Sequence, residues 1–344
     1  MNEQSLQTFS GLAGSHSTPM PANVAGLRYP HARVLLPRTR LAYVHLKNLL
    51  TDAKRDRSAR VSGYVVIWLP EEFLVLYLQR GELVNACSYE GKEFHPVAIG
   101  AAVEKVPGEP EYGEISFCEA EDEQLSCMYA SQTTPAVPWP SELRSTDPTA
   151  LFPYLMATTF DGLVEIAAEG EVNYLLFRHG SVQTAYLSGN HSGTMVERVS
   201  RLFPRERRAL HVTVRHWPEP VPLPVQAATG LVQAYRDLAT SLVLRLVADG
   251  RESAPAIAEH ARHTLATTHP ALEGFSFNGR PPRPVVADAG DLTEGIASLI
   301  NEILWTAGTP EGHGPEEMLR ELTHERRHLF ASAGLFDRLS WKLA

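Results

Sequence analysis

One short segment carries residue types that could do chemistry. Residues 324–328 read HERRH, which fits the pattern H-E-x-x-H. On a helix this spacing places two imidazoles on one face, where they can bind Zn²⁺, and puts a carboxylate beside the metal-bound water as a general base. A zinc-dependent hydrolase that uses His324, Glu325 and His328 is therefore one alternative function.

The residues around this motif argue against a metal site. Arg326 and Arg327 stand where buried catalytic helices carry uncharged residues, and they indicate a solvated face. After Glu325 the only acidic residue is Asp337, so the downstream glutamate of one kind of zinc site is missing. The chain also lacks the glycine-rich phosphate loops and the G-x-S-x-G nucleophile motif. We therefore expect no enzyme activity, no catalytic residues, no metal and no cofactor.

The elements that would position any site come from a segment that occurs twice. Residues 63–86 and 162–185 align without a gap at an offset of 99 residues. Gly63 matches Gly162, Gly81 matches Gly180, and apolar residues match at alternate positions between them. A repeat of this length indicates one supersecondary unit used twice. The repeated residues specify backbone shape and packing rather than chemistry.

Each copy predicts strand, turn, strand, tight turn and strand. The apolar and β-branched runs are typical of strands. Gly81 and Gly180 stand in the tight turns, where a positive φ is needed. We also expect a helix before each meander, then a helix and a final strand after it. In the first copy these flanking elements lie at 41–50, 97–106 and 114–118, and in the second at 149–156, 194–203 and 210–215.

This pattern resembles a known family. The residues that carry the resemblance are Ser62-Gly63 with Leu78-x-x-Gly81-x-Leu83-Val84-x-Ala86, and Asp161-Gly162 with Phe177-x-x-Gly180-x-Val182-x-x-Ala185. Over about residues 38–217 they resemble the bacterial PATAN domain, also called domain of unknown function 4388. The resemblance implies two non-catalytic modules of signalling proteins that control motility or development. It supplies no catalytic residues.

The last third of the sequence changes to helical periodicity. Amphipathic stripes at spacings of three and four predict four or five helices in a small bundle. Asp291 and Glu294 form a capping-box pattern before one of them. The expected fold class is α+β, with two repeated helix–β-meander–helix–strand units followed by an α-helical bundle. The expected domains are a disordered tail at 1–34, a first repeat at 35–125, a proline-containing linker at 126–147, a second repeat at 148–218 and a helical domain at 226–344.

Charge and composition exclude some classes of binding partner and some cellular locations. The formal net charge is −9 and the pI is about 5.9, which argues against nucleic acid as the main partner. No apolar run approaches the ~20 residues of a membrane span, and the polar N-terminus does not resemble a signal peptide. Three cysteines without a pairing or zinc pattern indicate a reducing compartment. We therefore expect a cytoplasmic protein without membrane insertion.

Together these patterns predict an adaptor of bacterial signal transduction that binds protein partners without catalysis. A strand edge or a helix groove of one repeat would dock the partner. The two repeats could pack as a pseudo-symmetric pair, and the chain could form a homo-oligomer. Besides the zinc-dependent hydrolase, the other alternative is a structural scaffold that only associates with itself.

Overall fold

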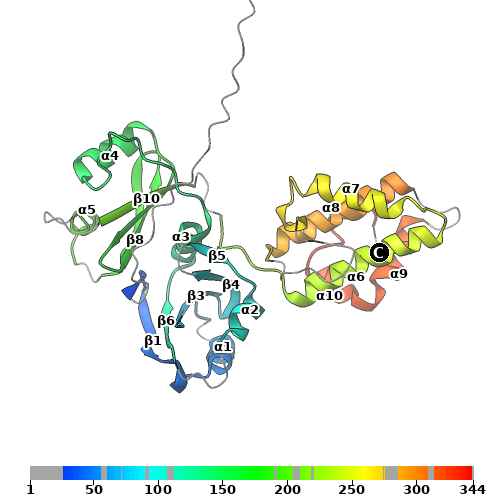
Figure 1. Ribbon diagram of the computed structural model, residues 1–344, viewed down its shortest axis with the longest axis horizontal. Helices are drawn as coiled ribbons and strands as arrows, with labels where there is room; N and C mark the ends of the chain where they lie inside the picture. Colours follow the sequence, from blue (N-terminus) through cyan, green and yellow to red (C-terminus); the bar gives the residue numbers. More distant parts are fainter. Residues whose placement is uncertain are drawn as a thin grey trace, which may run out of the picture. The chain divides into compact units, whose positions relative to one another are not determined.

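The computed structural model describes residues 26–55, 60–70, 72–89, 93–106, 112–189, 192–203, 210–217, 221–273, 275, 286–308 and 314–342. Helices and two antiparallel sheets occur together, which confirms the α+β class (Figure 1). The chain divides into two compact units. The first-repeat unit holds residues 32–129 and 221–344, and the second-repeat unit holds residues 1–31 and 130–220. None of the described helices is long and apolar enough to cross a membrane.

Six antiparallel strands form the sheet of the first-repeat unit, in the order β1-β6-β2-β3-β4-β5. The strands are β1 (Arg33–Arg40), β2 (Gly63–Trp68), β3 (Phe73–Gln79), β4 (Glu82–Tyr89), β5 (Phe94–Pro96) and β6 (Glu114–Glu119). The inner four strands are those predicted from the repeat, and β1 and β5 are added at the two edges.

Helices cover one face of this sheet. They are η2 (Leu41–Tyr43), α1 (Leu46–Arg55) and α2 (Ile99–Glu104). Alternate strand residues such as Val65, Ile67 and Leu76 pack against Leu46 of α1 and Ala102 of α2 in one buried apolar cluster. The opposite face packs on helix α3 (Asp122–Thr133), where the rings of Tyr77 and Tyr129 meet edge to face at 5.7 Å.

The second-repeat unit contains a four-stranded antiparallel sheet in the order β10-β7-β8-β9. Its strands are β7 (Gly162–Ala168), β8 (Glu171–Arg178), β9 (Ser181–Tyr186) and β10 (Leu210–His216). This order is the counterpart of β6-β2-β3-β4. Helices α4 (Pro148–Ala157) and α5 (Met195–Ser200) cover one face and share a buried core with alternate strand residues. Each predicted repeat element is therefore present in both copies.

The matched glycines at the start of β2 and β7 allow neighbouring backbones to approach closely. A Cβ on Gly63 would lie 2.1 Å from the carbonyl oxygen of Cys118, and a Cβ on Gly162 would lie 2.2 Å from that of Arg215. The two positions therefore have the same role, which is contact with the last strand of the repeat. This physical constraint explains why glycine occurs in both copies.

Both copies also use the same tight turn. Arg80 and Gly81 have φ values of 51° and 80°, and His179 and Gly180 have φ values of 49° and 74°. Two consecutive positive φ angles in a two-residue hairpin loop define the type I′ turn. The prediction that Gly81 and Gly180 have positive φ is confirmed.

Side chains cap these two turns in the same way. The Oγ of Ser62 accepts a hydrogen bond from the N–H of Arg80 at 3.1 Å. At the matched positions, Oδ1 of Asp161 accepts from the N–H of His179 at 2.8 Å. His179 thus belongs to a structural turn.

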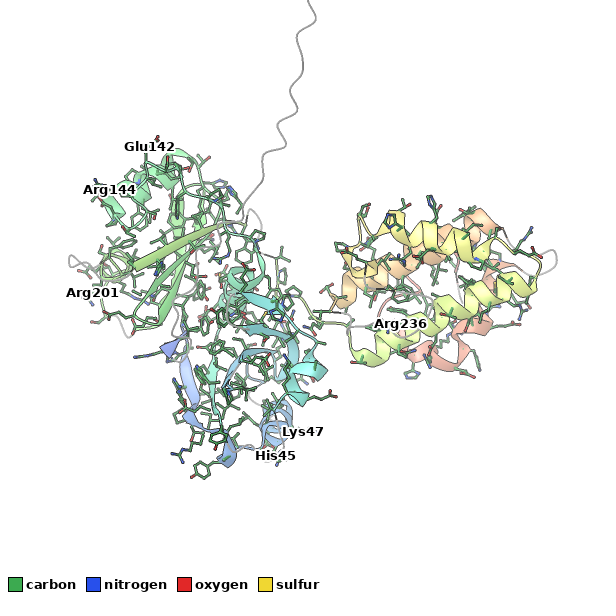
Figure 2. The ribbon with its side chains drawn as sticks, viewed as in Figure 1. His45, Lys47, Glu142, Arg144, Arg201 and Arg236 are labelled. Atoms are coloured by element: carbon green, nitrogen blue, oxygen red, sulfur yellow. The ribbon has the colours of Figure 1, made fainter. Side chains whose placement is uncertain are left out.

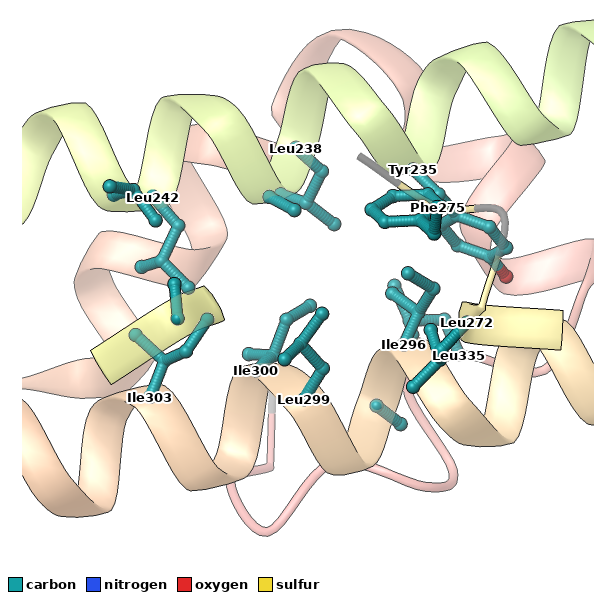
Figure 3. Close-up of a cluster of buried hydrophobic side chains, with 14 of the residues drawn as sticks. Tyr235, Leu238, Leu242, Leu272, Phe275, Ile296, Leu299, Ile300, Ile303 and Leu335 are labelled. Atoms are coloured by element: carbon teal, nitrogen blue, oxygen red, sulfur yellow. The ribbon is translucent and has the colours of Figure 1, made fainter. Parts of the chain in front are cut away.

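The C-terminal helices enclose a separate apolar cluster. They are α6 (Thr229–Ala248), α7 (Ala254–Leu265), η3 (Pro270–Leu272), α8 (Ala289–Ala307), α9 (Pro315–Thr323), η4 (His324–Arg326) and α10 (Arg327–Ser332). Figure 3 shows Leu238 and Leu242 of α6 directed at Ile300 and Ile303 of α8. The predicted stripes are therefore core positions.

Residues 26–34 are folded, although the sequence predicts a disordered tail over 1–34. Leu27 and Tyr29 are buried. Between them, the N–H of Arg28 donates to the carbonyl of Gly170 at 2.7 Å, and its carbonyl accepts from Val172 at 2.9 Å. Two apolar side chains and two backbone bonds hold this segment against the sheet. Residues 1–25 lie outside the described part of the chain.

Two other predictions need correction. The expected linker at 126–147 begins inside helix α3, whose buried side chains include Cys127 and Met128. The expected capping box at Asp291 lies inside α8, because Asp288 is the N-cap and accepts the N–H of Asp291 at 2.9 Å. The helix therefore starts three residues earlier than its sequence predicts, since Asp288 and Asp291 are both acceptable caps.

Candidate functional site

The HERRH segment does not lie on one α-helix. Helix α9 ends at Thr323, residues 324–326 form the 3₁₀ turn η4, and α10 begins only at Arg327. The break removes the regular one-turn spacing of His324 and His328, whose side chains are both exposed. Among the described residues, no group of three His, Cys, Asp or Glu side chains could hold a metal ion. The geometry gives the hydrolase alternative no support.

A buried ion pair in the second-repeat unit has a structural role. Nη1 of Arg215 on β10 lies 3.2 Å from Oε2 of Glu165 on β7, with side chains 12% and 6% exposed. Nε of Arg215 also donates to the carbonyl of Thr134 at 3.0 Å. Near this pair, burial raises the pKa of Tyr174 well above its usual range, and Ser131 donates to its hydroxyl. These partners satisfy the charges and fasten neighbouring segments to the sheet.

Arg236 on α6, labelled in Figure 2, is a half-buried cation. Its guanidinium lies 5.9 Å from the ring centre of Phe275, and desolvation lowers its pKa. Most of the loop beside Phe275 lies outside the described residues. We therefore assign Arg236 a packing contact with an aromatic ring.

A cavity of about 280 Å³ lies beside β4 in the first-repeat unit. Its lining residues are Asn85, Pro96, Tyr129, Pro224, Gln226, Val286, Ala287 and Asp288. The polar groups of this lining bond to one another or to the backbone. Nε2 of Gln226 donates to Oδ1 of Asn85 and to the carbonyl of Val97, both at 2.7 Å. The cavity thus marks the place where a distant segment crosses the edge of β4.

That segment closes the outer edge of β4. The N–H of Gln226 donates to the carbonyl of Val84 at 2.8 Å, and the N–H of Val97 donates to the carbonyl of Ala86 at 3.0 Å. The next residues of β4, from Cys87 to Tyr89, pair with β5. The backbone acceptors along this edge are therefore occupied by residues of the same chain.

The equivalent edge of the second repeat is open. Gln183 and Ala185 of β9 match Val84 and Ala86 of β4, and the two strands have the same bulge against their neighbours. Among the described residues, no backbone N–H donates to the carbonyls of Gln183 and Ala185 from outside the sheet. Strand β9 reads SVQTAY and carries no charge and no proline. Edges of this kind are templates for pairing with another strand.

The other sheet edges are protected. Strand β1 contains Pro37, three arginines and two register shifts, and β5 has three residues and ends at Pro96. At the β10 edge the N–H of Val137 donates to the carbonyl of Val214, and the indole of Trp139 donates to that of Val212. Proline, charge, short length and covering segments all discourage strand addition. Of the described edges, β9 alone has none of these protections.

The second repeat also exposes apolar side chains at positions that are partly buried in the first repeat. Met195 and Val196 at the start of α5 match Pro96 and Val97 of the first repeat by the same offset. Val97 packs against the first-repeat core, whereas Val196 is 75% exposed and Met195 is 42% exposed.

The sequence predicts docking at a strand edge or a helix groove of one repeat but does not identify which element. It gives no sign of the role of Gln226, which falls at the start of the expected helical domain. The sequence feature that could have identified the open edge is the lack of charged residues in β9. The closure of β4 depends on residues 141 positions apart, and no local pattern shows that pairing.

Comparison with known proteins gives no match. No family model matches the chain, and no curated protein or solved structure shows significant similarity to it. The class of protein is therefore defined by the fold itself, an α+β protein with a duplicated four-stranded unit and an attached group of helices.

Proposed function

We propose that this protein is a non-catalytic adaptor that binds protein partners through the open edge of β9. The observation that carries the proposal is the difference between two equivalent edges, of which β4 is closed by its own chain and β9 is not. The resemblance of both repeats to PATAN domains supports a role in bacterial signal transduction, in motility or developmental control. A cytoplasmic location is part of the same proposal.

Strand addition suits this edge physically. An extended segment would supply N–H groups to the carbonyls of Gln183 and Ala185, and main-chain hydrogen bonds would provide affinity. Neighbouring side chains would provide specificity, and the strand presents hydroxyl, amide and small apolar groups without charge. The exposed Met195 and Val196 offer apolar contact area on the same repeat.

Gln183→Lys tests the proposal in the full-length protein. Gln183 is exposed, so the substitution leaves the core intact, and lysine is a residue that natural edge strands use against pairing. Gln233→Lys on α6 is the matched control, because Gln233 is also exposed and the charge change is the same. We expect tagged Gln183→Lys protein to lose a protein that the wild type and Gln233→Lys both retain in quantitative affinity purification with cross-linking.

The proposal fails if all three proteins retain the same associated proteins, including copies of the chain itself. Among the described residues, no group of side chains favours the hydrolase alternative. A self-associating scaffold is the second candidate, because an uncharged edge strand can also receive a segment from an identical chain.

A further inference from the structure

The segment that closes β4 shows what this kind of edge accepts. We call residues 222–227, which read PLPVQA, the strap. Its residues alternate between two neighbours. The carbonyl of Pro224 accepts from Asn85 and the N–H of Gln226 donates to Val84. The N–H of Val225 points instead to Oδ2 of Asp288, at 3.2 Å.

The same residue pattern occurs once more in the sequence. Residues 19–24 read PMPANV, and we call them the tail segment. Both stretches are proline, apolar, proline, apolar, side-chain amide and apolar, and no other six residues of the chain fit this pattern. Asn23 takes the place of Gln226. The tail segment ends three residues before Leu27, which is buried in the second-repeat unit together with Tyr29.

Resting on the proposed function, we infer that the open β9 edge binds the tail segment of a second copy of this chain. The pairing reproduces the strap on β4. The N–H of Asn23 donates to the carbonyl of Gln183, as Gln226 does to Val84. The hydroxyl of Thr184, which stands where Asn85 does, is the available donor to the carbonyl of Pro21. Two copies that exchange tails in this way form a symmetric dimer.

The short connection between the tail segment and Arg28 determines whether β9 can bind the tail of the same copy or only that of another copy. The strap runs antiparallel to β4, because Pro224 bonds Asn85 and Gln226 bonds the preceding Val84. In the same register on β9, Val24 lies opposite Val182, which pairs with Phe177.

Arg28 is held in place because its carbonyl accepts a hydrogen bond from the N–H of Val172 on β8. Val172 lies five residues from Phe177 along this strand, a distance of about 17 Å. The four residues from Val24 to Arg28 span at most about 14 Å. The tail of the same copy therefore cannot reach this register, whereas the tail of a second copy can.

Charge and composition agree with this occupant. The strand SVQTAY is uncharged, and so are all six residues of the tail segment. The overall charge of −9 disfavours association of two copies by general electrostatics. Association must therefore come from a specific pairing, and added salt should strengthen it by screening the repulsion between the two copies.

Two proline substitutions in the full-length chain test the inference. Asn23→Pro removes the N–H that would bond Gln183, whereas Ala22→Pro removes the neighbouring N–H, whose counterpart at Val225 does not face the sheet edge. We expect wild type and Ala22→Pro to dimerise with similar dissociation constants in sedimentation equilibrium. Asn23→Pro should dimerise about tenfold more weakly or not at all.

Mixing experiments test the exchange directly. Asn23→Pro keeps an intact edge, and Gln183→Lys keeps an intact tail. Each alone should be monomeric, and an equimolar mixture should form a heterodimer held by one tail. Amide hydrogen exchange at Asn23, whose N–H is the proposed donor, should slow on dimerisation of the wild type.

Several results would overturn the inference. One is a wild type that stays monomeric at high micromolar concentration, and another is an equal effect of both proline variants. Slow exchange of the Asn23 amide in a wild type that stays monomeric would show that the tail binds its own copy. Loss of another captured protein in Gln183→Lys, with both proline variants unaffected, would leave the proposed function standing and refute the tail as the ligand.

Discussion

Gly63→Ala should destabilise the first repeat through one atom. The added Cβ would lie 2.1 Å from the carbonyl oxygen of Cys118 and 3.2 Å from the Cα of Glu119. These are backbone atoms of β6, which pairs with β2 along its whole length. No side-chain rotation relieves the overlap, so β2 and β6 must separate.

The size of the effect follows from this distance. A normal contact requires the two atoms to move about 1 Å further apart. That displacement breaks or weakens one or two ladder hydrogen bonds, each worth about 0.5–1.5 kcal/mol net, and adds strain at a buried position. We expect a loss of about 2–4 kcal/mol in unfolding free energy, within the range of backbone-clash mutants. Gly162→Ala should behave alike, because its Cβ would lie 2.2 Å from the carbonyl of Arg215.

The control is the same substitution in open space. Gly100 on α2 and Gly230 on α6 have no atom within 4 Å of a built Cβ. Alanine should raise helix stability there by up to about 1 kcal/mol. Urea unfolding followed by circular dichroism and by tryptophan fluorescence measures all four variants. An unfolding free energy of Gly63→Ala within about 0.5 kcal/mol of the wild type would refute the close-approach argument.

Three further predictions concern single features. Gly180→Val should lower the free energy of unfolding by roughly 1–3 kcal/mol. Valine is strained at a φ of 74°, and its Cβ would lie 2.6 Å from the backbone of α4. An unchanged melting temperature would contradict this prediction. All three cysteines are buried, and burial raises the pKa of the Cys87 and Cys118 thiols, so a disulfide reagent should label none in native buffer and three in denaturant. Replacing His324 and His328 together by alanine should leave zinc content, measured by plasma mass spectrometry, unchanged; loss of one zinc per chain would revive the hydrolase alternative.

Much of the fold could be predicted because its determinants are local. The gapless repeat located Gly63, Gly81 and their partners, and a glycine at a tight turn has a short-range cause. The helical stripes predicted the core of the C-terminal helices for the same reason. The start of α8 was missed because Asp288 and Asp291 compete as caps. Residues 26–34 were missed because Leu27 and Tyr29 are too few to show a period.

The candidate site could not be predicted in this way, because it depends on a difference that the repeat conceals. Residues 82–86 and 181–185 align without a gap and form the same hairpin and the same bulge. What distinguishes the first copy is the far segment around Gln226, 141 residues from Asn85, which closes the edge of β4. Both copies therefore keep the strand, but within the described part of the chain only β4 has a segment that covers its edge. The surface that best supports a function is therefore the edge of β9, where the backbone carbonyls of Gln183 and Ala185 can still accept hydrogen bonds.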